Sequence, residues 1–416
     1  MRPWLGAIAD DVTGATDLAS YLVAEGVPTE LSFGVPPGPV TVPEHGCLVV
    51  ALKTRSVPAA EAVQQSVQAA RRLLDAGVPR LYFKFCSTFD STAEGNIGPV
   101  AAALAELVGS RVTLLTPSAP AHRRTVYKGH LFVGDQLLHE SPMRHHPVNP
   151  MTDANLLRLL RAQTAAPVAL LDRERLRTGG PDLAASLAEL TPGTLLVVDA
   201  ITDDDLMLIA GLADDLAAPL VAGSAGLVHA LARAQPRGSP PAPPPVPDGP
   251  FAVIAGSRSA ATTAQVAAYE RSHPSYVVDP VRVADGEDVI GEARAFLARH
   301  WNDAPLVRAS ADVATAHQAL GVERSAAVVE QTLAACAAEA VAVGMRRILV
   351  AGGETAGAVI ERLRIQRVRI GASLDPGVCW CVTVSEPALG LVLKSGNFGS
   401  PDLFARAAGP AHAGWA

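Results

Sequence analysis

Apolar, strand-like segments alternate with alanine-rich, helical segments along most of the chain. Residues 59–77, for example, have a helical pattern, and strand-like runs precede and follow them. The runs are apolar at successive positions, so both faces of each strand must be covered. Helices between the strands provide that cover when the strands are parallel. We therefore predict an α/β fold with mainly parallel sheets covered by helices, whose strands include 4–9, 47–52, 80–85, 112–116, 194–200, 251–256, 347–352 and 389–396.

A proline-rich segment interrupts this alternation once. Residues 236–250 read PRGSPPAPPPVPDGP, and proline cannot continue a helix or an inner strand. Such a sequence forms a semi-rigid linker. It separates residues 1–235 from residues 251–416, each within or near the size of one domain. We predict two domains, each with its own sheet.

Composition excludes several classes of protein. The 416 residues are 49% hydrophobic and the mean hydropathy is +0.23, which is too apolar for a disordered chain. The net charge of −7 argues against a dedicated nucleic-acid binder. No apolar run approaches the ~20 residues of a membrane-spanning helix. Five cysteines without metal-type spacing predict a protein of the reducing cytoplasm. An alanine-rich α/β enzyme of this kind could also form a homodimer.

Ligands of parallel α/β sheets bind beyond the carboxyl ends of the strands, so the residues that follow each strand are the candidates for function. Asp10 and Asp11 follow the first strand and lead into a helix. One carboxylate suffices for capping that helix, and Asp17 suits its first turn. Two adjacent carboxylates favour a catalytic role, in which one is a general base and the other orients the substrate or a metal ion. Adjacency does not decide which is the base.

Two basic segments follow the next strands. Lys53 to Ser56 form either a solvated loop or an anion clamp, in which the Arg55 fork holds a carboxylate. Lys84 lies on a buried-type strand, which has no use for a lysine without a partner. It begins the run KFCSTFDST, which adds Ser87, Thr88 and Asp90. We interpret this run as part of the site.

Residues 117–152 have little periodicity and carry many polar side chains, as active-site loops do. Tyr127 and His130 are candidate substrate contacts there. The histidines lack metal-type spacing, and we assign no catalytic role to residues 119–123. Lysine is rare in this chain: only Lys53, Lys84, Lys128 and Lys394 stand among 34 cationic residues, and each lies in a segment singled out here. This bias suggests that arginine could not replace them.

The second half has three glycine-containing junctions after strands, at 255–269, 351–363 and 394–407. Each places free N–H groups near a helix start, where an anion is stabilised. Neither a Walker motif nor a G-x-G-x-x-G fingerprint follows a strand, so the junctions predict a different kind of nucleotide phosphate site. Lys394 is a candidate phosphate contact, and Glu354 could bind Mg²⁺ or cap its helix. Polyol- and anion-binding groups in one half and phosphate loops in the other predict phosphoryl transfer in an interdomain cleft.

The sequence resembles the four-carbon acid sugar kinases, most closely those that act on 3-oxo-tetronate. The matching stretches span nearly the whole chain in order: IADDVTGATDLA, ALKTRSVPA, YFKFCSTFDSTAEGNIGPV, TVYKGHLFVGDQLLHES, MTDANL, VAGSAGL, VAGGETAGAV, IGASLDPGVCW and LKSGNFGSPDLF. The resemblance implies an N-terminal acid-sugar domain, a C-terminal ATP domain and ATP- and Mg²⁺-dependent phosphorylation of the 4-hydroxyl.

The resemblance also implies a set of site residues. Those on the acid-sugar side are Asp10, Asp11, Arg55, Lys84, Ser87, Thr88, Asp90, Tyr127 and His130, with Asp10, Asp11 and Lys84 as catalytic candidates. Those on the ATP side are Ser257, Gly352, Gly353, Glu354, Thr355, Lys394, Ser395, Gly396 and Asn397. Alternative functions are a D-threonate or D-erythronate 4-kinase and a non-catalytic, nucleotide-regulated binding protein. An aldolase or dehydrogenase would need a Schiff-base lysine or a dinucleotide fingerprint.

Overall fold

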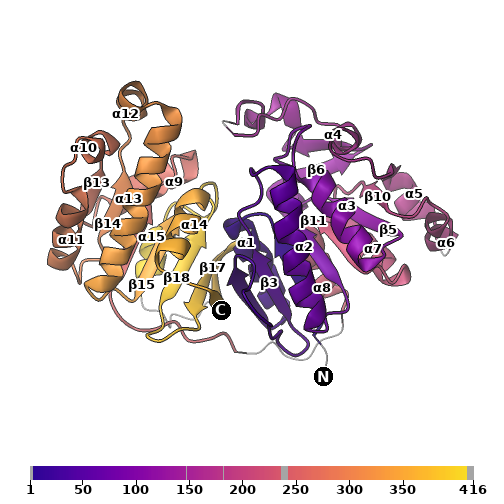
Figure 1. Ribbon diagram of the computed structural model, residues 1–416, viewed down its shortest axis with the longest axis horizontal. Coiled ribbons are helices and arrows are strands. Elements are labelled where there is room, and N and C mark those ends of the chain that lie inside the picture. The colour runs from indigo at the N-terminus through magenta and orange to yellow at the C-terminus, as the bar shows by residue number, and fades with distance from the viewer. Residues whose placement is uncertain (1–2, 147, 181, 236–241, 410–416) are drawn as a thin grey trace. The chain divides into compact units, whose positions relative to one another are not determined.

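The computed structural model of the chain contains two compact units, Met1–Pro241 and Ala242–Ala416 (Figure 1). It describes residues 3–146, 148–180, 182–235 and 242–409. Of the predicted linker, residues 236–241 lie outside this description, and residues 242–250 form neither helix nor strand. Each unit is built around a sheet with helices, so the predicted α/β class is confirmed. Within the described ranges, no helix is long and apolar enough to cross a membrane.

The sheet of the first unit is parallel throughout its described pairings. Across the sheet its strands are β2 (Thr29–Phe33), β3 (Cys47–Ala51), β1 (Leu5–Ala9), β4 (Leu81–Lys84), β11 (Leu220–Gly223), β5 (Val112–Thr116), β10 (Thr194–Val198) and β9 (Val168–Leu171). The helices are α1 (Val12–Ala24), α2 (Ala59–Asp75), α3 (Ile97–Val108), α4 (Leu156–Gln163), α5 (Arg173–Thr178), α6 (Asp182–Ala188), α7 (Asp203–Asp215) and α8 (Ala225–Arg233). Helix α2 packs beside α3 and α3 beside α4, while α1 packs beside α8 and α8 beside α7.

Register brings the ends of the central strands to one level. Ala9 pairs with Ala51 on one side and with Lys84 on the other, and Lys84 pairs in turn with Gly223. Parallel strands place all their carboxyl ends at the same edge of the sheet. The loops after β1, β3 and β4 therefore meet there.

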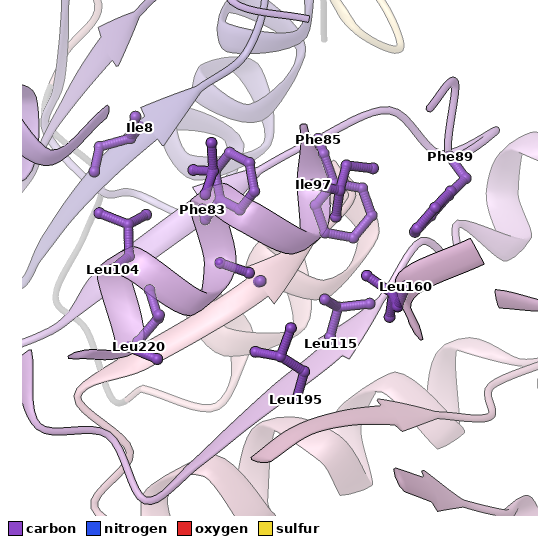
Figure 2. Close-up of a cluster of buried hydrophobic side chains, with 14 of the residues drawn as sticks. Ile8, Phe83, Phe85, Phe89, Ile97, Leu104, Leu115, Leu160, Leu195 and Leu220 are labelled. Atoms are coloured by element: carbon purple, nitrogen blue, oxygen red, sulfur yellow. The ribbon is translucent and has the colours of Figure 1, made fainter. Parts of the chain in front are cut away.

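A hydrophobic core fixes the loop that follows β4 (Figure 2). Phe83 on the strand and Phe85 and Phe89 in the loop are all buried, with successive ring centroids 5.8 Å apart. They pack with Ile97 and Leu104 of α3. Burial of such a side chain contributes about 1.5–3 kcal/mol. The polar residues between these aromatic anchors are thereby held at the edge of the sheet.

The segment expected to be a long loop contains a small antiparallel sheet instead. Strands β6 (Arg124–Tyr127), β7 (His130–Val133) and β8 (Gln136–Leu137) form it, preceded by the 3-10 turn η1 (Pro120–His122) and followed by η2 (Leu138–Glu140) and η3 (Pro142–His145). Val126 bridges to Ala200, which follows β10. The strands are too short for a clear period-two pattern, which explains why the sequence suggested a loop.

The sheet of the second unit has a parallel part and an antiparallel edge. Its order is β13 (Ser275–Val278), β14 (Leu306–Ala309), β12 (Phe251–Ala255), β15 (Arg347–Ala351), β18 (Gly390–Lys394), β17 (Val378–Thr383) and β16 (Arg367–Asp375), with β17 antiparallel to both of its neighbours. The helices are α9 (Ala260–Tyr269), α10 (Pro280–Ala284), α11 (Val289–Arg299), α12 (Val313–Leu320), α13 (Val322–Ala342), α14 (Gly353–Arg362) and α15 (Leu403–Ala408). Ala255, Ala351 and Lys394 lie at one level, so three neighbouring strands end together.

Candidate active site

Arg55 joins three carboxylates at the carboxyl edge of the first sheet. Its Nε and Nη2 donate to both oxygens of Asp10 at 3.0 and 2.8 Å, and Nη2 also lies 2.6 Å from Asp11. Nη1 is 3.5 Å from Asp90. We call Asp10, Asp11, Asp90 and Arg55 the aspartate–arginine cluster. The sequence suggested that this fork clamps a substrate carboxylate, but here its bidentate face binds Asp10.

Asp11 also caps a helix. It accepts from the Gly14 N–H at 3.0 Å at the start of α1 and from the Thr13 hydroxyl at 2.7 Å. Burial would raise the pKa of Asp11, but Arg55 and Lys84 outweigh burial and hold it below the ordinary value. Asp11 is therefore an ionised carboxylate with both oxygens engaged. Asp11 therefore both caps α1 and belongs to the aspartate–arginine cluster.

The loop after β4 brings its polar residues to the cluster in a strained conformation. Phe89 and Asp90 both have positive φ angles, 62° and 40°, which are uncommon for residues other than glycine. Asp90 is buried, and the Asn149 amide donates to its Oδ1 at 3.1 Å. Thr88 is buried and lies 3.0 Å from the Cys86 sulfur. Ser87 is half-buried beside it.

Lys84 is a buried ammonium without an ion pair. Its side chain is only 3% exposed, and Nζ donates to the Phe85 carbonyl at 3.0 Å. Within the described part of the chain, no carboxylate lies within 4 Å of it. A Cβ on Gly14 would stand 3.0 Å from this Nζ, so the glycine leaves room for the ammonium beside the start of α1. An unpaired buried cation in a polar site is typical of a functional group that awaits an anionic ligand.

The sequence gave no functional weight to two further groups near this lysine. Asp17 was assigned to the first turn of a helix, but α1 begins at Val12, so Asp17 lies beyond that turn. It is 8% exposed, and its Oδ1 is buried without a hydrogen-bond partner. Arg124, at the start of β6, likewise has a buried Nε without a partner and forms no ion pair within the described ranges. Burial, Arg124 and Lys84 together lower the pKa of His122, which places that imidazole near both cations.

No hydrogen bond or ion pair within the described ranges joins Tyr127 or His130 to the aspartate–arginine cluster. They flank the tight turn of the β6–β7 hairpin, whose Lys128 and Gly129 N–H groups donate to the buried Asp199 at 2.7 and 2.9 Å. The Tyr127 side chain is 49% exposed, and His130 contacts Asn155 at 3.2 Å. Their polar contacts are therefore with the hairpin and with Asn155, and their role as substrate contacts stays a prediction.

The second unit brings its three glycine junctions together around Ser257. A Cβ on Gly396 would come within 2.3 Å of the Ser257 hydroxyl, and one on Gly256 within 2.1 Å of the Thr355 hydroxyl. Gly352 has a φ of 130°, which only glycine adopts readily. It precedes α14, whose N-terminus has no side-chain cap. The N–H groups of Gly353, Glu354 and Thr355 are therefore available to an anion.

Lys394 holds the third glycine junction in place through buried hydrogen bonds. It is fully buried, and Nζ donates to the Thr262 hydroxyl, the Gln265 amide oxygen and the Gly396 carbonyl at 2.8, 2.9 and 3.1 Å. All three ammonium protons are thus used within the protein. Burial lowers its pKa to about 7. Lys394 positions the third junction and does not itself reach solvent, which differs from the direct phosphate contact that the sequence suggested.

The remaining ATP-side candidates line the same edge. Ser395 and Gly396 are half-buried, and Asn397 and Glu354 are exposed. No three His, Cys, Asp or Glu side chains form a metal site within the described ranges. Mg²⁺ bound to a nucleotide needs only one or two carboxylates, because phosphates and waters complete its shell. Glu354, in the first turn of α14 and free of a capping role, fits that requirement.

Comparisons with known proteins cover nearly the whole chain. A family model described as "Sugar-binding N-terminal domain" matches residues 5–231, and one described as "Nucleotide-binding C-terminal domain" matches residues 252–404. Two curated relatives named 3-oxo-tetronate kinase, from Burkholderia multivorans and Cupriavidus necator, are each 45% identical to this chain. The alignments cover 98% and 97% of this chain and 97% and 96% of the relatives.

Two crystal structures resemble the fold. One is from Salmonella typhimurium LT2, where the protein is described as a putative tRNA synthase; it is 40% identical, with a TM-score of 0.85, over 98% of this chain and 99% of the other. The other is a Haemophilus influenzae protein, 36% identical, with a TM-score of 0.78, over 97% and 98%. The similarity thus extends over both units.

Proposed function

Because the chain belongs to the 3-oxo-tetronate kinase family, we propose that it transfers the γ-phosphoryl group of ATP to the 4-hydroxyl of a 3-oxo-tetronate. The observation that carries the proposal is that each unit has a site of a different kind. The first unit gathers carboxylates and unpaired cations after its strands. The second gathers glycine junctions and an uncapped helix start.

The first unit suits a small, anionic, hydroxylated substrate. Its carboxylates and hydroxyls can bind sugar hydroxyls, whereas the substrate carboxylate needs a cation. Arg55 is already engaged by aspartates. Arg124 has no carboxylate partner within the described ranges, so we assign the recognition of the acid group to Arg124, which leaves Lys84 for the acceptor hydroxyl.

The second unit suits nucleotide phosphates. The N–H groups at the start of α14 and the close backbone approach allowed by Gly352 and Gly396 stabilise negative charge without a Walker lysine. Mg²⁺ held by Glu354 and the phosphates would neutralise charge on the transferred group. Lys394 keeps the third junction in place by donating to the Gly396 carbonyl.

Phosphoryl transfer requires little covalent chemistry from the protein. It requires an acceptor hydroxyl held in line with the γ-phosphorus, positive charge near the transferred group and an acceptor for the hydroxyl proton. The strained loop at Asp90 and the aspartate–arginine cluster supply rigid positioning. The buried ammonium of Lys84 supplies charge where water is excluded.

A substrate panel tests the proposal. The protein is incubated with ATP, Mg²⁺ and 3-oxo-tetronates, D-erythronate or D-threonate, and ADP release is measured together with the phosphorylated product. We expect turnover that is fastest with a 3-oxo-tetronate and yields the 4-phosphate. Faster turnover with D-erythronate or D-threonate would transfer the assignment to those acids. Absence of ADP release with every acid, in protein that binds ATP, would favour a nucleotide-regulated binding protein.

A further inference from the structure

The acceptor site contains four buried or half-buried aspartates, and three of them are already engaged. Asp10 gives both oxygens to Arg55. Asp11 gives one oxygen to Arg55 and Gly14 and the other to Thr13. Asp90 is held by Arg55 and Asn149. Protonation of any of these three carboxyl groups would weaken hydrogen bonds or ion pairs that the fold already makes.

Asp17 is the exception. Its Oδ1 is buried without a hydrogen-bond partner, and no cation lies within 4 Å of the carboxyl group in the described ranges. Lys84 is near enough to lower its pKa, and Asp11 near enough to raise it. The nearby phenols of Tyr21 and Tyr82 also feel its charge. Tyr21 is in turn held by His122, at 3.0 Å, and its ring lies on His229.

A buried carboxyl group with an unused oxygen, beside a buried and unpaired ammonium, is costly for the fold. Within the described ranges, neither group forms an ion pair within 4 Å that would offset this cost. A hydroxyl near Lys84 and Asp17 would satisfy both, since it accepts from the ammonium and donates to the carboxylate. The pair therefore has the chemistry required to bind and activate an alcohol.

We infer that Asp17, rather than Asp10 or Asp11, takes the proton of the acceptor hydroxyl, an assignment that rests on the proposed kinase function. The hydroxyl oxygen forms a bond to the γ-phosphorus while the bond to the β,γ-bridging oxygen breaks and ADP leaves. The hydroxyl proton passes to the Asp17 carboxylate and later to water. Lys84 keeps the unprotonated carboxylate available and stabilises the oxygen as it attacks.

The electrostatics of the site agree with this geometry. Burial raises the pKa of Asp17 from the ordinary 3.8 to about 6, although Lys84 opposes the change. A general base is most effective when its pKa lies near the working pH. The engaged Asp11 has a lowered pKa and is a poorer base.

Asp17→Asn tests the assignment, because it removes the base and preserves the shape. We expect kcat to fall by roughly 10²- to 10⁴-fold, while the KM values for ATP and for the acid change by less than about threefold. In the wild type kcat should fall below about pH 6, and this acid limb should disappear in the variant. Asp17→Glu should recover part of kcat. A kcat of Asp17→Asn within threefold of wild type would overturn the assignment.

Glu25→Gln is the matched control. Glu25 directly follows the C-terminus of the same helix, pairs with His229 at 2.8 Å and has no role in the proposed chemistry, so kcat should be unchanged. If Asp17→Asn does not fold, the wild-type profile decides: no loss of kcat between pH 7 and pH 5 would refute the base. An inactive wild type would refute the kinase proposal instead. An active wild type with an unaffected Asp17→Asn would refute only the inference.

Discussion

Replacement of Asp17 by asparagine should stabilise the first unit at alkaline pH although it lowers kcat. The carboxyl group is 8% exposed and lacks a hydrogen bond at Oδ1, so its ionised form is disfavoured in the folded state. Its pKa rises from 3.8 in the ordinary environment to about 6 in the fold. The difference is roughly two pKa units, or about 3 kcal/mol at ~1.4 kcal/mol per unit, by which ionisation destabilises the fold at pH 8.

The sign follows from proton uptake. Between pH 3.8 and about 6 the folded state binds more protons at this group than the unfolded state, so the free energy of unfolding falls as the pH rises through that window. The asparagine variant lacks this dependence. Its amide still lacks partners, which costs about 1–2 kcal/mol, so we expect a net gain of roughly 1–2 kcal/mol at pH 8. Lowering the pH to 5 should reduce the advantage over wild type by about 1–2 kcal/mol.

Calorimetric unfolding at pH 8 and pH 5 measures this difference. For a unit of this size 1 kcal/mol corresponds to a shift of roughly 2–4 °C in Tm. ADP or ATP in the sample identifies the transition of the second unit, since a ligand stabilises only the unit that binds it. An asparagine variant that is less stable than wild type at pH 8, or whose advantage is the same at pH 5, would refute the argument that Asp17 is buried at a cost.

Further variants test other parts of both sites. Arg55→Gln leaves two buried carboxylates and a half-buried one without their cation, and urea unfolding should show a loss of about 3–5 kcal/mol. Lys394→Arg places a larger cation among three acceptors fitted to an ammonium; calorimetric titration should show ATP binding weakened by tenfold or more, with the KM for the acid unchanged. Gly396→Ala introduces a Cβ 2.3 Å from a serine hydroxyl and should weaken ATP binding similarly. Arg124→Gln should raise the KM for the acid by roughly tenfold, whereas Arg123→Gln at the neighbouring position should not.

The sequence predicted the core strands and the positions of the loops, because burial on both faces leaves a continuous apolar signal. It did not predict strand order. The meeting of Asp10 with Arg55 depends on β3 lying beside β1, and the meeting of the glycine junctions depends on β12, β15 and β18 being neighbours. Strand β16 was missed because polar and apolar residues alternate in it, and β13 because it is short and mostly only half-buried or exposed. The partners of side chains were also beyond prediction: Asp17 matched the composition of a helix start, and only its missing hydrogen bond sets it apart.

The scarcity of lysine has a different meaning at each of its four positions. Lys53 is exposed, and Lys128 is exposed and reaches Asp172 at 3.3 Å, so an arginine would serve at either place. Lys84 and Lys394 are 3% and 0% exposed. At Lys394 three acceptors surround a single nitrogen, and a guanidinium would bring five N–H groups into that space. At Lys84 the nitrogen is buried close to the glycine at the start of α1, where a Cβ would stand 3.0 Å away, so a bulkier guanidinium would crowd this position. The structure therefore explains the choice of lysine at two of the four positions: Lys394, which holds the glycine junctions, and Lys84, near the proposed base.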